Sequence, residues 1–425
     1  MVHTMKVRNL VQKFAACAVV LTAAVTALAQ RPQAPRQEKL LNGLKLLIWN
    51  DPSASNVTVK IRVHSGTSFD PQGKEGVMSL LSESFFPNEG TREFYRDDLG
   101  GDLDVRANYD YIQISASSKP DQFLTMLESV ANAASTPTID KETTPKLVAR
   151  RLEKIKDLEE DPGYIANLAA AKQLFGTFPY GRPELGTAES VAKISFADLL
   201  DAKQRFLGAD NATVVISGNV DPALAFRAAR RYFGAWLKSD KIVPPTFKQP
   251  DAPDTKLVTI SSDAGSNSTI RFAFRGVARN DRLYPASEIL ASVLESRLKE
   301  NLSGLNAANA FVSNEAHVLP GTVVVGLDMT GSEPVSGNTI TALLARPVTP
   351  TEFAAAKTVV TEARKKVAVD EYWLDADTYK QASPTTEQKA FDSVTIADVQ
   401  LIAESFAKNP VVAIALTKTE KAASN

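Results

Sequence analysis

The chain has 425 residues, of which 44% are hydrophobic and 23% charged, and its formal net charge is -1. This composition is typical of a globular protein, and the length is sufficient for two or more domains. A chain this close to neutrality has no general electrostatic attraction for nucleic acid or for an anionic membrane surface, so neither class of partner is expected.

The first 29 residues have the pattern of a secretory signal peptide. Lys6, Arg8 and Lys13 precede an apolar run that ends in Ala-Leu-Ala before Gln30. A basic region, a short apolar core and a small-x-small site predict cleavage after Ala29. The alternative is an uncleaved membrane anchor, for which the run is short. We therefore expect export and a periplasmic location.

Few residues remain for metal or thiol chemistry after cleavage. Cys17 is the only cysteine and would be removed with the signal peptide. The mature chain would then form no disulfide and no thiolate metal site. An exported chain without cysteine suggests a bacterial envelope protein. His64 and His317 lie far apart in the sequence, so a local histidine cluster is not indicated.

Residues 38–237 predict a first domain, preceded by a flexible polar lead-in at 30–37. Alternating apolar and polar residues around Asn42 and Gly43 predict a hairpin. The segment 141–175 predicts a long, polar-faced helical region, interrupted at 161–163. The other predicted elements are a helix beginning near Gly76, strands over 109–118 and 211–220, and helices over 121–135, 195–207 and 222–237.

A proline-rich segment, residues 238–255, lacks apolar periodicity and predicts a linker. Beyond it, residues 256–420 repeat the order of strands and helices and predict a second domain. The fold class is therefore predicted to be α+β, with two similar domains. We predict strands over 256–263, 268–276, 321–329 and 411–417, a helix over 283–298, and helices beginning near Thr349 and Thr395.

Several blocks, in this order along the chain, resemble the M16 family of zinc metallopeptidases. The resemblance covers essentially the whole mature chain and implies two M16-type α/β-roll domains. The blocks are GKEGVMSLLSESFFPNEGT at 73–91, Pro-Tyr-Gly-Arg-Pro at 179–183, Gly-Thr at 186–187, Ser-Gly-Asn at 217–219 and the C-terminal block at 393–416.

The zinc motif of that family is absent. M16 enzymes carry HxxEH on a helix, where two histidines four residues apart reach one Zn²⁺ and the glutamate activates water. The matching positions here hold Ser79, Ser82 and Glu83, and the family's more distant glutamate ligand aligns with Lys154. The resemblance thus implies no catalytic residue and no metal or cofactor bound by this chain. An ion pair between Glu83 and Lys154 is one arrangement that could replace the metal.

A serine nucleophile is the catalytic alternative at this helix. Ser79 or Ser82 would need a base such as His64 within hydrogen-bond reach, together with an oxyanion hole. The sequence indicates neither. Serines that face a cavity or solvent are the simpler interpretation.

The resemblance also suggests substrate-binding residues. Some M16 heterodimers have a non-zinc subunit that supplies an arginine–tyrosine pair to the substrate, and residues 294–313 match that region. Arg297 and Lys299 are the cationic candidates there, whereas the tyrosine position falls on Ala307. Arg106 is a further candidate because it lies on the strand that matches the family's substrate-facing edge, where an extended peptide can pair with the main chain.

We therefore expect a catalytically inactive M16-like subunit of an exported zinc peptidase heterodimer that degrades unfolded peptides. This chain would supply part of the chamber wall and substrate contacts, and zinc would be held only by the partner subunit. The alternative is a stand-alone peptide-binding or structural envelope protein without peptidase activity. A third hypothesis, an active metallopeptidase with unconventional ligands, is distinguished by a metal assay. No nucleic acid partner and no stable membrane span are expected.

Overall fold

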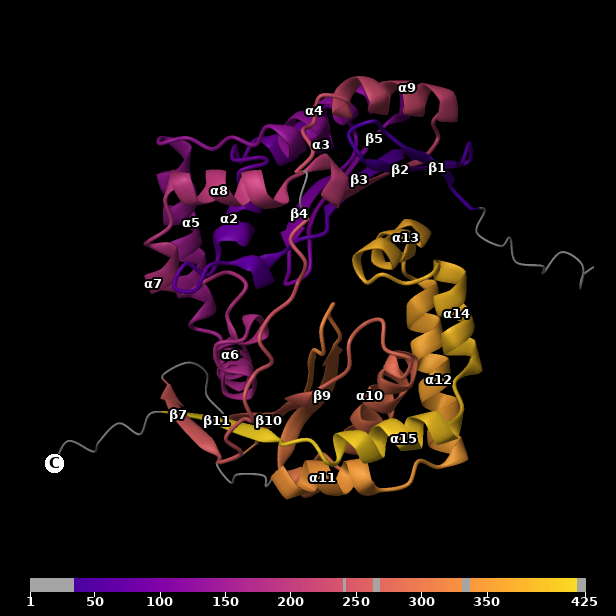
Figure 1. Cartoon of the computed structure of the whole chain (residues 1–425). Coiled ribbons are helices and arrows are strands. Elements are labelled where there is room, and N and C mark those ends of the chain that lie inside the picture. Colours follow the sequence, from indigo (N-terminus) through magenta and orange to yellow (C-terminus); the bar gives the residue numbers. More distant parts are fainter. Residues whose placement is uncertain (1–33, 240–241, 263–267, 331–336, 419–425) are drawn as a thin grey trace, which may run out of the picture. The chain divides into compact units, whose positions relative to one another are not determined.

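The computed structural model describes residues 34–239, 242–262, 268–330 and 337–418, so the predicted signal peptide and Cys17 lie outside the described residues. The chain forms two mixed β-sheets with helices packed on them (Figure 1). The predicted α+β fold class is confirmed. Among the helices in the described ranges, none has the length and apolar content needed to cross a membrane.

The first sheet has six strands in the order β1-β2-β6-β3-β5-β4. The turn at Asn42 and Gly43 joins the neighbouring strands β1 and β2, as predicted. Strand β6, from much later in the chain, lies between β2 and β3, parallel to β2 and antiparallel to β3. The strands are β1 (Arg36–Lys39), β2 (Lys45–Asn50), β3 (Val57–Val63), β4 (Leu103–Ala107), β5 (Ile112–Ser118) and β6 (Ala212–Gly218).

The second sheet repeats this topology with five strands in the order β7-β11-β8-β10-β9. Its last strand, β11, also lies between the first two, parallel to β7 and antiparallel to β8. Each edge pair that follows is antiparallel in both sheets. The internal repeat predicted from the sequence is therefore confirmed. The strands are β7 (Val258–Ser262), β8 (Thr269–Arg275), β9 (Ala307–Glu315), β10 (Thr322–Met329) and β11 (Val412–Lys418).

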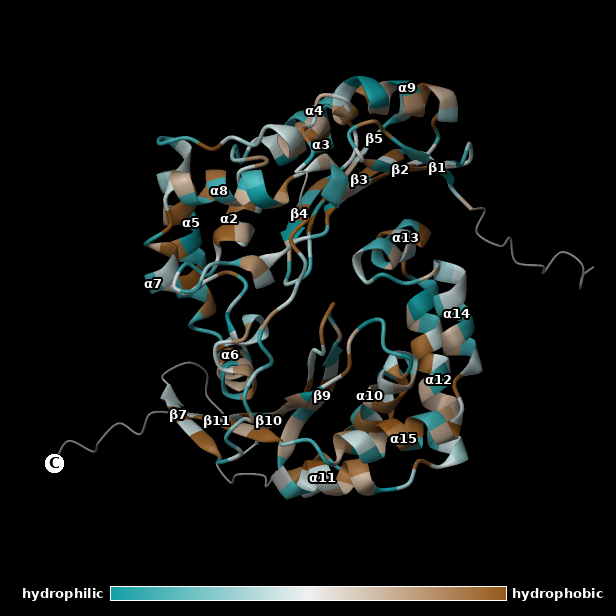
Figure 2. Ribbon diagram, in the orientation of Figure 1, coloured by the Kyte–Doolittle hydropathy of each residue, from teal (hydrophilic) through white to brown (hydrophobic). Residues whose placement is uncertain are grey.

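Amphipathic helices cover the sheets, and α5, α8 and α9 each show hydrophobic and hydrophilic residues along their length (Figure 2). Capping boxes at Thr187, Thr349 and Thr395 fix the first residues of α7, α12 and α15. The first half contains α2 (Val77–Glu83), α3 (Thr91–Asp97), α4 (Phe123–Ser135), α5 (Thr143–Leu158), α6 (Pro162–Phe175), α7 (Ala188–Val191), α8 (Phe196–Phe206) and α9 (Pro222–Phe233). The second half contains α10 (Tyr284–Lys299), α11 (Gly337–Ala345), α12 (Pro350–Lys365), α13 (Val369–Thr378), α14 (Pro384–Ser393) and α15 (Ile396–Phe406).

One helix from each half packs on the sheet of the other half. Helix α6 buries Ala170, Leu174 and Phe175 in an apolar cluster that includes residues of β8 and β11. In the opposite direction, Leu374 of α13 packs with Leu47 and Val215 of the first sheet. The first of these contacts is mainly apolar, whereas the second is surrounded by charges.

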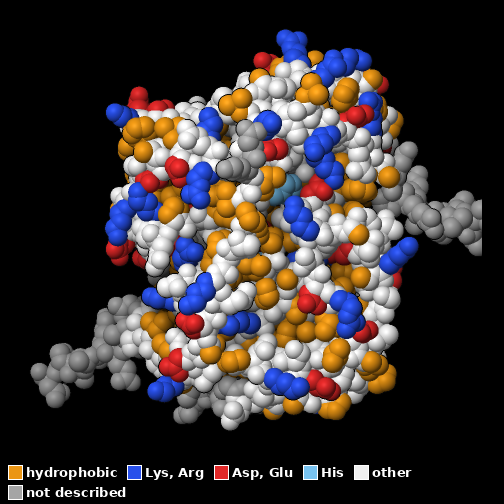
Figure 3. All heavy atoms as spheres, viewed as in Figure 1, with side chains coloured by type: hydrophobic (Ala, Val, Ile, Leu, Met, Phe, Trp, Pro, Cys, Tyr) orange, Lys and Arg blue, Asp and Glu red, His pale blue; other side chains and the backbone are white. Residues whose placement is uncertain are grey.

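Basic and acidic side chains are interspersed on the face shown in Figure 3, in agreement with the near-neutral net charge. Strand β3 is different, because its charged residues are buried. Val59 and Ile61 belong to the hydrophobic core of the first half, while Lys60 and Arg62 point to the other face of the sheet and are covered by α13. The ion pairs are Lys60 with Asp370 and Glu371 at 2.9 and 2.8 Å, Arg62 with Glu371 and Asp375 at 2.5 and 2.6 Å, and Lys45 with Asp377 at 2.7 Å.

Candidate functional site

Helix α2 is the helix that the sequence resemblance matches to the zinc helix of M16 enzymes, and its start is fixed by a buried carboxylate. Asp70 accepts hydrogen bonds from the backbone N–H groups of Gly76 and Met78, both at 2.7 Å. Burial raises the pKa of Asp70 to about 7. Gly76 has φ +100°, and a Cβ there would lie 2.7 Å from the Leu185 carbonyl oxygen. The loop therefore requires glycine just before the helix.

The two faces of α2 have different roles. Val77, Leu80 and Leu81 are buried in the hydrophobic core. Ser79 and Ser82 are also nearly inaccessible, but they line a cavity of about 490 Å³ beside the helix. The Ser82 hydroxyl donates to the Ser79 carbonyl at 2.6 Å, so it is engaged by its own helix.

An arginine that the sequence interpretation did not select fills the ligand face of α2. Arg151 of α5 is only 2% exposed. Its Nη1 donates to Ser79 Oγ and to the Leu185 carbonyl, both at 3.0 Å, and its Nη2 lies 2.5 Å from Glu83 Oε1. The guanidinium thus bonds to two of the three positions that match HxxEH.

The suggested Glu83–Lys154 pair does not form. Lys154 lines the same cavity but is exposed, whereas Arg151, one helical turn earlier on α5, forms the ion pair with Glu83. The planar guanidinium presents several donors in fixed directions, so one side chain can bind a carboxylate, a hydroxyl and a carbonyl together. A lysine ammonium has fewer donors and no such geometry.

The residues around α2 do not fit a zinc ion. Two serine hydroxyls, one carboxylate and a guanidinium supply neither the histidine ligands nor the negative charge that a tetrahedral Zn²⁺ site requires. Within the described residues, no group of three or more His, Cys, Asp or Glu side chains is placed to hold a metal ion. We therefore derive no hydrolytic step at this site.

Neither distant histidine lies at this helix as a catalytic base. The ring nitrogens of His64 lie 3.0 Å from the hydroxyl oxygens of Thr378 and Thr213, and burial lowers the pKa of His64. His317 Nδ1 lies 2.9 Å from Asp110 Oδ2. Burial opposes protonation of His317, but the hydrogen bond to Asp110 and nearby carboxylates together raise its pKa. Both histidines are therefore held by hydrogen-bond partners away from α2.

Arg297, predicted to contact substrate, is instead buried within the second half. Its five N–H donors are all used: they bind both oxygens of Glu352 at the start of α12, one carbonyl oxygen near the end of α11 and two in the turn between these helices. No donor is left for a substrate carbonyl. The local sequence could not show this, because the partners lie about 50 residues further along the chain.

The two other predicted substrate contacts remain accessible. Lys299 lies on the last turn of α10 and pairs with Glu295 of the same helix. Arg106 lies on β4, at the edge of the first sheet, and its Nη2 is 3.2 Å from Glu371 Oε2. Of these two, only Arg106 borders the cavity beside α2.

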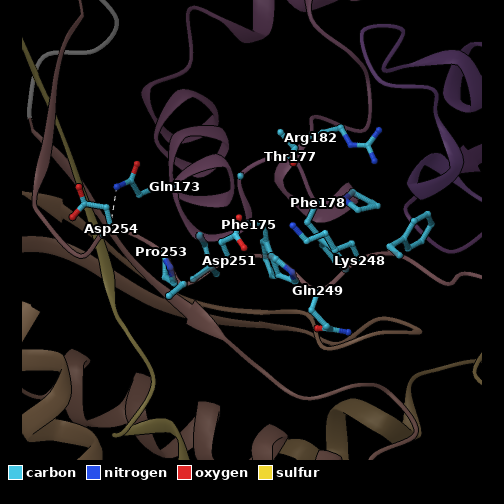
Figure 4. A pocket seen from close by; sticks show the side chains of 16 residues that line it. Gln173, Phe175, Thr177, Phe178, Arg182, Lys248, Gln249, Asp251, Pro253 and Asp254 are labelled. Atoms are coloured by element: carbon cyan, nitrogen blue, oxygen red, sulfur yellow. Dashed lines mark hydrogen bonds between the residues drawn. The ribbon is translucent and has the colours of Figure 1, made fainter.

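A second cavity, of about 430 Å³, lies between the end of α6, the turn after it and the linker (Figure 4). Phe175 and Phe178 line it from one side and Lys248, Gln249 and the residues after them from the other. The Gln173 side chain closes part of it by donating to the Asp254 carbonyl at 2.9 Å. None of the residues predicted as a site lines this cavity.

Comparison with known proteins identifies relatives of the chain in sequence and in fold. A family model described as "Peptidase M16 inactive domain" matches residues 193–359. That match begins just before α8 and ends in α12, so it does not include α2. A curated relative, an "Uncharacterized zinc protease" of Rickettsia bellii, is 23% identical over 210 residues, which are 48% of this chain and 50% of the relative.

Solved structures extend the similarity over nearly the whole chain. A peptidase M16 inactive domain from Pseudomonas fluorescens covers 91% of this chain and 98% of its own, with a TM-score of 0.78 and 18% identity. The chain is thus similar to M16 peptidases, in sequence over residues 193–359 and in fold over nearly its whole length. A protease from Helicobacter pylori covers 90% of this chain and 100% of its own, with a TM-score of 0.81 and 16% identity. In sequence, the chain aligns with about half to two thirds of the length of these curated relatives.

Proposed function

We propose that this protein is a non-catalytic subunit of an exported zinc peptidase and forms one wall of the chamber in which a zinc-bearing M16 partner degrades unfolded peptides. The observation that carries the proposal is the Arg151 guanidinium bound to Ser79 and Glu83 on α2. A positive charge fixed at the metal-ligand positions repels Zn²⁺, so hydrolysis would require a second subunit.

The edge strand β4 supports a role in holding peptides. It pairs with β5 on one side, and the sheet order places no described strand on its other side. An extended peptide can add to such an edge through main-chain hydrogen bonds, which are independent of peptide sequence. We propose that the periplasm is the compartment, reached through the predicted signal peptide at 1–29.

The mature chain alone should bind well under one equivalent of zinc and should not cleave unfolded peptides. The physical reason is that the aligned ligand positions carry serines, a carboxylate engaged by arginine, and a lysine. Elemental analysis of protein purified without chelator, together with a peptidase assay, measures both properties. One tightly bound equivalent of zinc that is lost in a Glu83→Ala variant would contradict the proposal.

Co-expression with an M16 protein that carries HxxEH, ideally one encoded beside this chain, should yield a complex with peptidase activity that neither chain has alone. Size-exclusion chromatography detects the complex, and kcat/KM with an unfolded peptide measures its activity. If the zinc-bearing protein is fully active by itself, the obligate-subunit role is wrong. Because β4 and the adjacent cavity belong to this chain alone, that result would favour a stand-alone peptide-binding protein.

A further inference from the structure

The cavity beside α2 has an excess of positive side chains. It is formed by residues of α2, α3, β4 and α5, together with residues of adjoining loops. Five cationic residues and only two carboxylates line it. The cavity beside the helix that matches the zinc helix is therefore positively charged. The cations are Arg92, Arg106, Arg150, Arg151 and Lys154, and the carboxylates are Glu83 and Glu89.

Three of these cations already have acidic partners. Arg151 binds Glu83, Arg150 lies 3.0 Å from Glu89, and Arg106 lies 3.2 Å from Glu371. The side chains of Arg92 and Lys154 form no ion pair or hydrogen bond with any residue in the ranges that the structure describes, and both residues are exposed. They are therefore available to an anionic ligand that enters the cavity.

Arg151 has a further unused donor. Its Nε–H is buried and has no hydrogen-bond partner among the described residues, although Nη1 and Nη2 are both engaged. A buried donor without an acceptor is unfavourable. An anionic oxygen that reached this side chain would satisfy the donor while gaining a charge-assisted hydrogen bond.

We infer that this cavity is a carboxylate-binding subsite for extended peptides. Leu103, Val105 and Ala107 of the edge strand β4 line the same cavity as the cations. A peptide paired with β4 would therefore place a side chain or its C-terminal end beside Arg92 and Lys154. The inference rests on the proposed function in taking an unfolded peptide as the ligand, but it does not depend on a zinc-bearing partner.

A peptide carboxylate has two sources, an Asp or Glu side chain and the chain terminus. Isothermal titration calorimetry on the purified mature chain distinguishes them with three unlabelled peptides of one neutral, extended sequence. One peptide is amidated, the second is amidated and carries a single internal glutamate, and the third has a free C-terminal carboxylate. We expect the second or the third to bind about tenfold more tightly than the first, the low end for a charge-assisted hydrogen bond.

Charge reversal tests whether the cavity provides this preference. Lys154→Glu and Arg92→Glu should each abolish most of the tenfold gain without changing the affinity for the neutral amidated peptide. Lys156→Glu is the matched control, because Lys156 is exposed on the same helix and does not line the cavity. It should leave the preference unchanged.

Different results would contradict the carboxylate subsite and the peptide-contacting role of the chain. Equal affinity for all three peptides, or the same loss in Lys154→Glu and Lys156→Glu, would overturn the carboxylate subsite while leaving peptide binding by the chain intact. Binding of none of the peptides would overturn the subsite and the peptide-contacting role together. The heterodimer would still be decided separately by the co-expression experiment.

Discussion

Replacing Arg62 by alanine is expected to lower the free energy of unfolding by about 3–5 kcal/mol, as breaking a buried ion pair usually does. Arg62 is fully buried, donates to Gln113 at 2.7 Å, binds Glu371 and Asp375, and lies 4.0 Å from the centre of the Tyr111 ring. In the variant, Glu371 and Asp375 of α13 would face the sheet without the arginine that pairs with them. Urea unfolding followed by circular dichroism measures the change.

Arg205→Ala is the control for this measurement. Arg205 forms an exposed pair with Asp201 on α8 at 3.5 Å, and such surface pairs contribute about 0–1 kcal/mol. A double variant, Arg62→Ala with Glu371→Ala, should lose less stability than the two single variants together, because the pair is coupled. Equal shifts in Arg62→Ala and Arg205→Ala would show that the charges between α13 and the first sheet do not stabilise the protein.

Arg297→Ala is expected to have a loss of similar size, about 3–5 kcal/mol, within the second half. The substitution removes the donors for Glu352 and for the carbonyls of Leu343, Arg346 and Pro347. The hydrogen bond from Arg297 is the largest of several interactions that hold the pKa of Glu352 well below its usual value. Arg297→Lys should recover only part of the loss, since an ammonium cannot replace the planar guanidinium.

Arg346→Ala provides a matched control, because Arg346 also binds Glu352, at 2.8 Å, but its side chain is 52% exposed. It should cost less than about 1 kcal/mol. If Arg297 instead contacts substrate, as the sequence suggested, the opposite result is expected. In that case, Arg297→Ala would keep normal stability and lower kcat/KM of the assembled complex, which would overturn the structural role.

The predictions that relied on local pattern agree with the structure. The helix near Gly76 is present as α2, and the same order of strands returns after the linker in the second sheet. The interruption predicted at 161–163 lies slightly earlier, at 159–161, because Pro162 is the first residue of α6. Each of these depends on periodicity, turn residues and proline within a few positions, and that information is local. The loss of HxxEH was readable for the same reason.

The predictions that failed concerned the partners of single charges. The sequence suggested Lys154 as a possible partner of Glu83 and Arg297 as a candidate substrate contact, yet Arg151 binds Glu83 and Glu352 binds Arg297. Arg150 and Arg151 are adjacent in the sequence, but only Arg151 turns toward α2. Arg151 and Lys154 are three residues apart, so a helix places them near one face. This spacing was the sequence feature that could have indicated Arg151 as a partner of Glu83.

The sequence by itself determined the two similar halves, most of the helices and strands within them and the absence of the zinc ligands, because residue identity and short-range periodicity are sufficient for each. Only the tertiary structure decided which charges are buried. Lys60 and Arg62 alternate with apolar residues as on a solvent-facing strand, and α13, about 310 residues later, covers them with carboxylates. Whether a charge is hydrated or paired depends on what packs over it, and that neighbour is fixed by the fold of the whole chain.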